Sequence, residues 1–154
     1  MKKIILLLNE LETKIEFRDI ENLSVSKRGV SWHIDHTLKV LNHVIETLKN
    51  TKPIDTKRKF NILKQLVFIT GIIPRGKAKA PKLVQSFEEI TFDDLHVQLT
   101  NARISVSLLN HLNDNCNFIH PYFGVLNVKE TEKFLYLHTK HHIKIINDII
   151  QKKS

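Results

Sequence analysis

Residues 134–143 read FLYLHTKHHI, and this stretch places two histidines, His138 and His142, four positions apart. In an α-helix, side chains four residues apart lie on the same face, with their Cβ atoms about 6 Å from each other. Two imidazoles at that spacing can bind a single transition-metal ion. The stretch therefore predicts a helix that carries part of a metal site.

The pattern around these histidines indicates that both face the protein core. Core positions recur at alternating intervals of three and four residues, which is typical of a buried helix face. That face consists of Val128, Thr131, Leu135, His138, His142, Ile145 and Ile149. A buried imidazole without a partner costs roughly 1–3 kcal/mol. A metal ion, or hydrogen bonds to side chains or water, must therefore satisfy both rings.

A second helix with histidines is predicted from Val30 to about Lys49. At about 100° per residue, its apolar residues form one continuous arc. The arc consists of Val30, Ile34, Leu38, Leu41, Val44, Ile45 and Leu48. His33 lies inside the arc and His36 lies at its border, so helical periodicity alone slightly favours His33 as a third ligand.

The order and spacing of these residues resemble the DinB/YfiT-like superfamily of metal-binding four-helix bundles. The likeness rests on Trp32-x-x-x-His36, on the turn 120–124 of sequence HPYFG, and on His138-x-x-x-His142 in a last helix. It covers nearly the whole chain and is greatest for uncharacterised branches of the group. The resemblance implies one divalent metal bound by His36, His138 and His142, and it selects His36 from the two candidates on the second helix.

The donor set and the resemblance together suggest the chemistry. Three neutral imidazoles suit zinc, nickel, copper or iron and leave coordination positions open; we expect zinc or nickel. A divalent metal can lower the pKa of bound water to about 7 and deprotonates a bound thiol. Characterised relatives include S-transferases and isomerases that use low-molecular-weight thiols. The resemblance thus implies a metal-dependent transferase or hydrolase that activates a thiol or water and acts on a small-molecule substrate.

Two other functions stay open at this point. The first is a non-catalytic helical protein, of stress-related or other role, whose metal stabilises the fold. The second, which we rank lower, is a basic module associated with nucleic acid. The net charge of +8 allows such binding, but the sequence has neither an aromatic-interleaved basic surface nor a nucleic-acid motif. No catalytic residue is assigned from the sequence.

Composition predicts a single small domain over residues 1–154. The chain is 42% hydrophobic, with four glycines and four prolines, so it can form a core and long helices. The apolar run Ile4–Leu8 is too short for a signal peptide, and no segment approaches the about 18 apolar residues that span a membrane. A single cysteine, Cys116, excludes an internal disulfide and lies in a polar loop, so a catalytic role is not expected. We expect a cytoplasmic protein that binds no membrane; a homodimer is compatible with the sequence.

The expected fold is all-α, an up-and-down four-helix bundle with a helical insert between the second and third long helices. Asn127 and Glu130 form a sequence pattern typical of a capping box at the start of the last helix. The other helices are predicted over about residues 3–16, 30–49, 92–112 and, for the insert, 56–70.

Two further features have both a functional and a structural interpretation, and the remaining histidines have a structural one. The segment Arg75–Lys82 carries four cations and could bind an anion, but a solvated insertion is favoured. His120 precedes a proline, and a structural turn is favoured over a role as proton carrier near the metal. Surface or helix-flank positions are expected for His43, His96, His111 and His141.

Overall fold

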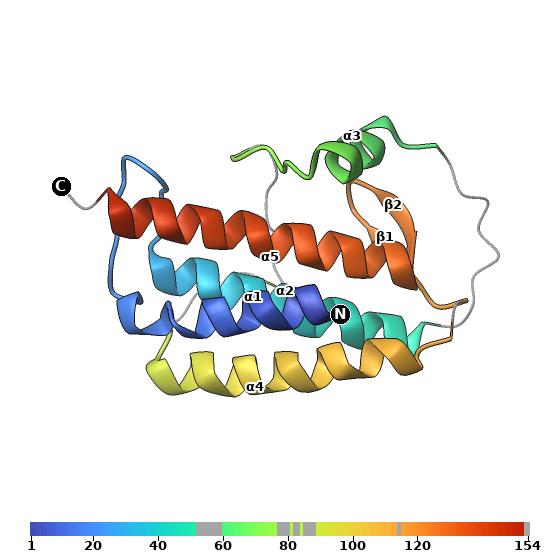
Figure 1. Ribbon diagram of the computed structural model, residues 1–154, viewed down its shortest axis with the longest axis horizontal. Helices are drawn as coiled ribbons and strands as arrows, with labels where there is room; N and C mark the ends of the chain where they lie inside the picture. The colour runs from blue at the N-terminus through green and yellow to red at the C-terminus, as the bar shows by residue number, and fades with distance from the viewer. Residues whose placement is uncertain (52–59, 77–80, 82–83, 85–88, 114, 153–154) are drawn as a thin grey trace.

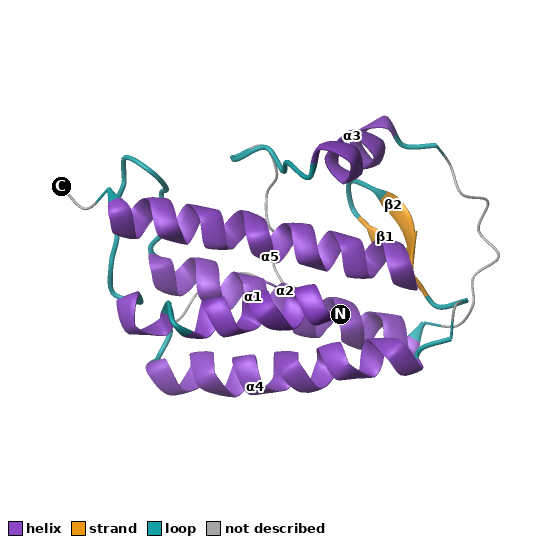
Figure 2. Ribbon diagram, viewed as in Figure 1, coloured by secondary structure: helices purple, strands orange, loops and turns teal. Residues whose placement is uncertain are grey.

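The computed structural model describes residues 1–51, 60–76, 81, 84, 89–113 and 115–152. This part of the chain is mostly helical, with one two-stranded sheet (Figure 2). The helices are α1 (Lys2–Glu12), α2 (Val30–Asn50), α3 (Ile62–Thr70), α4 (Phe92–Leu108) and α5 (Val128–Gln151), with the 3-10 turns η1 (Ile15–Phe17) and η3 (Leu109–His111) and the strands β1 (Asn117–His120) and β2 (Gly124–Asn127). The prediction of a mainly helical protein is confirmed, and the two-stranded sheet is an addition to it.

Four long helices surround the core. Helix α2 packs against α4 and α5, and α1 packs against the same two helices, so α1 and α2 lie diagonally opposite each other (Figure 1). The centre is filled by aliphatic side chains that are fully buried. They include Ile4, Leu8, Ile34, Leu38, Leu41, Leu95, Leu99, Leu135 and Ile146. None of the described helices is both long and apolar enough to cross a bilayer.

The relative directions of the helices differ from an up-and-down arrangement. Gln98 of α4 donates to Asp35 of α2 at 2.6 Å, and Ser105 donates to Asn42 at 3.3 Å, so α4 runs parallel to α2. The expected antiparallel succession is therefore wrong at this step. The reason is the connection between them, because α2 ends at one end of the molecule and α4 begins at the other (Figure 1).

Several helix ends differ from their predicted positions. Helix α1 ends at Glu12, not near residue 16, and the chain continues into η1. Helix α4 ends at Leu108 and tightens into η3, which covers most of the remaining predicted length. The insert helix α3 begins at Ile62, where the side chain of Asn61 accepts a hydrogen bond from Lys64 N. Residues 56–59 of the predicted insert lie outside the described residues.

The start of α5 agrees with its predicted capping box. Asn127 Oδ1 accepts from Glu130 N at 2.8 Å, and Glu130 Oε2 accepts from Asn127 N at 3.1 Å. These reciprocal bonds satisfy backbone groups that have no partner within the helix. The histidine-bearing helix therefore begins where local sequence predicts.

The β1–β2 hairpin was not predicted. Its register pairs Phe118 with Leu126 and Ile119 with Val125, and Gly124 adopts a φ of 71°, which favours glycine. His120 stabilises the turn, because its Nδ1 accepts from the backbone N–H groups of residues 122 and 123, both at 3.1 Å. This geometry supports the structural interpretation of His120.

Candidate metal centre

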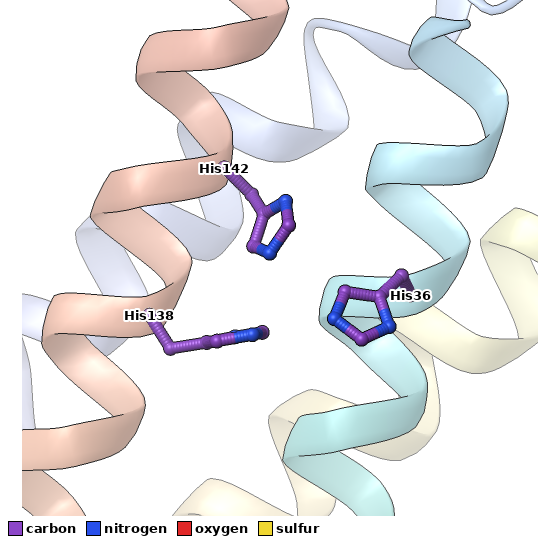
Figure 3. A group of neighbouring side chains, drawn as sticks. All are labelled: His36, His138 and His142. Atoms are coloured by element: carbon purple, nitrogen blue, oxygen red, sulfur yellow. The ribbon is translucent and has the colours of Figure 1, made fainter. Parts of the chain in front are cut away.

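Three histidines from two helices converge in the core. His138 and His142 come from α5 and His36 comes from α2, and one ring nitrogen of each lies within 4.8 Å of those of the other two. Figure 3 shows the three rings turned toward a common point between the helices. His36 and His142 are buried and His138 is half-buried. A group with these spacings could hold one metal ion.

The packing of α2 against α5 brings the third ring to the pair. The two helices run antiparallel, since the ring of His36 lies 5.2 Å from that of His138 while His33, one turn earlier, bonds to His142. His36 also lies 4.9 Å from His142, centroid to centroid, so it contacts both rings of the pair. The geometry therefore groups His36, rather than His33, with the two histidines of α5.

The ring of His36 is oriented by groups outside the cluster. Its Nδ1 lies 2.9 Å from the carbonyl oxygen of Val84, and because a carbonyl only accepts, Nδ1 carries the proton. The lone pair is then on Nε2. Trp32 stacks on the ring, with 4.9 Å between centroids and 7° between planes. A fixed tautomer and a stacked ring are typical of histidines that bind metals.

His33 lies behind His142 rather than beside the cluster. The Nδ1 atoms of the two rings are 3.0 Å apart, and His33 Nε2 lies 2.9 Å from Ser26 Oγ. Two proton arrangements satisfy these contacts. In one of them, Nδ1–H of His142 donates to His33 and Nε2–H of His33 donates to Ser26, which leaves Nε2 of His142 free for a metal. Helical periodicity alone favoured His33, whereas the three rings that could hold one ion include His36.

His138 lies against other rings of the core. Its imidazole contacts the rings of Phe134, His36 and His142, and within the described part of the chain neither of its ring nitrogens has a hydrogen-bond partner. A metal ion would provide that partner, and the donor set of three imidazoles therefore fits a divalent transition metal.

The electrostatics of the cluster favour neutral rings. Burial is the largest cause in each case, and neighbouring positive groups add to it, so the pKa of His138 and that of His142 lie well below the ordinary value. Burial also lowers the pKa of His36, although its bond to Val84 opposes the shift. It lowers the pKa of His33 to about 4. Neutral imidazoles have lone pairs available for a metal at neutral pH.

The remaining histidines and the cysteine are less involved. His43 and His111 are exposed, whereas His96 and His141 are half-buried on helix flanks, which is consistent with the sequence-based expectation. His141 lies edge-on to His142, with 5.2 Å between centroids, and burial lowers its pKa to about 4. Its position next to His142 in the sequence was the available signal for this contact. Cys116 is buried.

The basic segment after α3 contacts α5 through its first cation. Arg75 Nη2 lies 2.6 Å from Asp148 Oδ2, so this guanidinium forms a salt bridge on the outer side of α5. Lys77, Lys79 and Lys82, the other cations of the segment, lie outside the described residues. The favoured interpretation of the segment as a solvated insertion therefore stays a prediction.

Comparison with models of protein families, with curated proteins and with solved structures finds no match for this chain. The class of protein is therefore defined by its own fold and site. It is a mainly helical protein whose core contains three histidines that could hold a metal ion. The resemblance to the DinB/YfiT-like superfamily stays a prediction from the sequence.

Proposed function

We propose that this protein binds one divalent transition metal, zinc or nickel, through His36, His138 and His142. We further propose that it is a DinB-like metal-dependent transferase or hydrolase that activates a thiol or water. The observation that carries the proposal is the convergence of three neutral ring nitrogens within 4.8 Å, on rings from two different helices.

The protein supplies orientation and a sheltered environment. Val84 and Trp32 fix the ring of His36, and His33 with Ser26 fixes that of His142. Partners of this kind typically change metal affinity by 10–100-fold. A bound metal ion would supply Lewis-acid chemistry that lowers the pKa of a water or thiol.

The three histidines of the cluster differ in burial. His36 and His142 are buried, while His138 is half-buried. No described carboxylate is placed against the three rings by the observed contacts, so we assign no general base.

Metal analysis of purified variants tests the ligand set. We expect about one zinc or nickel ion per chain, with the ion lost in His36→Ala, His138→Ala and His142→Ala. In His33→Ala we expect the ion to be retained with affinity reduced about 10–100-fold, because that residue only orients His142. Full metal binding by all three ligand variants would refute the site.

The matched control for these variants is His43→Ala. His43 is also on α2 but is exposed and remote from the cluster's ring contacts. The His43→Ala variant should bind metal as the unmodified protein does. Loss of metal in this variant would indicate a general effect of histidine removal on the protein rather than a specific site.

A second function, a non-catalytic protein whose metal stabilises the fold, is favoured by one observation. The ligands come from the facing sides of two helices, so an ion would cross-link α2 to α5 in the core. Chelation separates the two functions. A stabilising metal predicts unfolding on chelation and no reaction with a panel of thiols and electrophiles. An enzyme predicts metal-dependent conjugation or hydrolysis that His142→Ala abolishes.

A further inference from the structure

Helix α3 presents apolar side chains to solvent and buries a charged one. Lys64 is only 7% exposed, whereas Ile69 is 81% exposed. The exposed side chains follow one another along the helix and its two ends. Together they form the α3 face, which consists of Phe60, Ile62, Leu63, Leu66, Ile69 and Ile72, each at least 43% exposed. Contiguous apolar surface of this kind on a small protein marks a site of interaction.

Specific contacts hold α3 in this orientation. Lys64 Nζ donates to Glu130 Oε1 at 2.9 Å, at the start of α5, and Asn61 donates to the carbonyl oxygen of Tyr122 at 2.9 Å. On the same inner side, Phe68 packs edge-on against Phe123, with 5.9 Å between centroids. The apolar face is therefore held outward by an ion pair, a hydrogen bond and a ring contact. Figure 1 shows α3 outside the four long helices, beside the hairpin.

The net charge of the protein lies in the same part of the sequence. Residues 52–82 contain nine of the 24 lysines and arginines but one of the 16 acidic residues. The rest of the chain contains fifteen cationic and fifteen acidic residues, so it is neutral overall. The whole excess of +8 therefore belongs to the 31 residues that contain α3.

A described cation lies beside α3. The side chain of Lys133 on α5 is exposed, and its Nζ lies 5.3 Å from the centre of the Phe68 ring. Lys57, Arg58 and Lys59 directly precede Phe60 in the sequence but lie outside the described residues. The exposed apolar face is thus accompanied by positive charge.

We propose that the α3 face binds the surface of an anionic lipid bilayer. An exposed apolar helix face enters the boundary between headgroups and acyl chains, and adjacent lysines and arginines are attracted to anionic lipids. Neither the apolar face nor the positive charge alone would indicate an anionic bilayer as the partner. A nucleic acid would use the charge but leave Ile69 and Leu66 in water, and a second copy of the chain would bring two strongly positive segments together.

This proposal revises one expectation from the sequence. Membrane binding was not expected, because no segment of the sequence is long and apolar enough to span a bilayer. The described helices agree, since none of them is long and apolar enough either. Binding at the surface needs only a short apolar face with flanking charge. It is independent of the metal, since the α3 face contains none of the three histidines.

Sedimentation with lipid vesicles tests the proposal. The full chain should bind vesicles of phosphatidylcholine mixed with phosphatidylserine, should not bind vesicles of phosphatidylcholine alone, and should bind less as salt rises. Ile69→Glu should weaken binding at least about tenfold, because it removes buried apolar area and adds a negative charge. Lys133→Glu, at the exposed lysine beside Phe68, should weaken it about fivefold or more.

Matched variants elsewhere on the surface serve as controls. Ile104 on α4 is 57% exposed, so Ile104→Glu makes the same change on another helix and should bind vesicles as the unmodified protein does. Lys27→Glu, at an exposed position outside the basic segment, controls for total charge. Helical content by circular dichroism and bound metal should be unchanged in all four variants, which excludes misfolding.

Several results would overturn the proposal. One is failure to bind the anionic vesicles, and another is equal binding to neutral vesicles. Equal loss in Ile69→Glu and Ile104→Glu would show that the α3 face is not the contact. A dimer that Ile69→Glu dissociates would assign the face to a second copy. Binding to RNA or duplex DNA that Lys133→Glu weakens and Ile69→Glu leaves unchanged would assign the charge to nucleic acid.

Discussion

Helices α5 and α3 lie against each other yet place polar and apolar residues in opposite ways. Helix α5 buries Leu135 and Ile146 and directs its histidines inward, where they contact one another and α2. Helix α3 buries Lys64 and leaves Ile69 and Leu66 in solvent. Both arrangements depend on partners for the inward polar groups. In α5 the partner is a ring on another helix, and in α3 it is the carboxylate of Glu130.

Periodicity identifies residues on a common helix face but does not identify which face is buried. Helix α5 has polar residues on one side, so only one orientation buries its apolar face. Helix α3 is apolar on most sides, and its orientation was decided by contacts to the hairpin and to Glu130. The two helices therefore should respond differently to metal, truncation, loss of charge and acid.

Metal should produce the largest effect, and it should act through α5. At a free zinc or nickel concentration about 1,000 times the dissociation constant, binding to the folded state adds about 4 kcal/mol to the free energy of unfolding. Denaturant titrations with and without metal measure this. The gain should vanish in His142→Ala and persist in Ile69→Glu. A gain that persists in His142→Ala would place the metal elsewhere.

Truncation of an isoleucine should distinguish the two helices next. Ile149 of α5 is 0% exposed, so Ile149→Ala should cost about 2–5 kcal/mol through lost burial and the cavity it leaves. Ile69→Ala on α3 should change the free energy of unfolding by less than about 0.5 kcal/mol, because that side chain is in water already. Equal costs in urea denaturation would show that Ile69 is covered in solution.

The ion pair that orients α3 should give a smaller, asymmetric effect. Glu130→Gln keeps a side chain able to cap α5 but leaves Lys64 without its charged partner, so we expect a cost of about 1–3 kcal/mol. Lys64→Met replaces the charge by an apolar side chain of similar length and should cost less than about 1 kcal/mol. Thermal unfolding of both single variants and the double variant measures this. Equal costs for the single variants would contradict a burial penalty on the lysine.

Protonation of His120, in the hairpin that supports α3, should have the smallest of these effects. Burial lowers the pKa of His120 from 6.5 to about 4 in the folded protein, where its Nδ1 accepts two backbone hydrogen bonds. Between pH 6.5 and 4 the unfolded chain binds more protons, so the stability from this group is present above pH 6.5 and falls as pH is lowered. In His120→Asn, which keeps an acceptor, the loss between pH 7 and 5.5 should be smaller by about 1 kcal/mol. An unchanged loss would remove His120 from the acid response.

Local features of the sequence were sufficient for α2 and α5. The apolar arc of residues 30–49 and the face containing His138 and His142 depend on a 3.6-residue period, which is a property of the helix itself. The capping box at Asn127 is equally local, because all its atoms lie within four residues. Helix ends were less well predicted, as at α1, where the chain leaves α-helical geometry after Glu12 for a 3-10 turn.

The hairpin and the role of His33 could not be predicted in the same way. Strands β1 and β2 are four residues each, and neither has a pattern long enough to stand out from a loop. His33 and His36 both lie on the inner side of α2. Which of them joins His138 and His142 depends on the position along α2 at which α5 packs. The resemblance to a family selected His36, whereas helical periodicity alone favoured His33.

The sequence by itself determined the helical character of the chain, the paired histidines of α5, the start of that helix and the concentration of positive charge in residues 52–82. These follow from residue types and from contacts within a few positions along the chain. Only the tertiary structure decided that α2 and α4 run parallel, that His36 joins the pair while His33 supports it, and that α3 turns its apolar face outward. The physical reason is that these features depend on packing between segments far apart in the sequence, whose free energy is not encoded in any one of them.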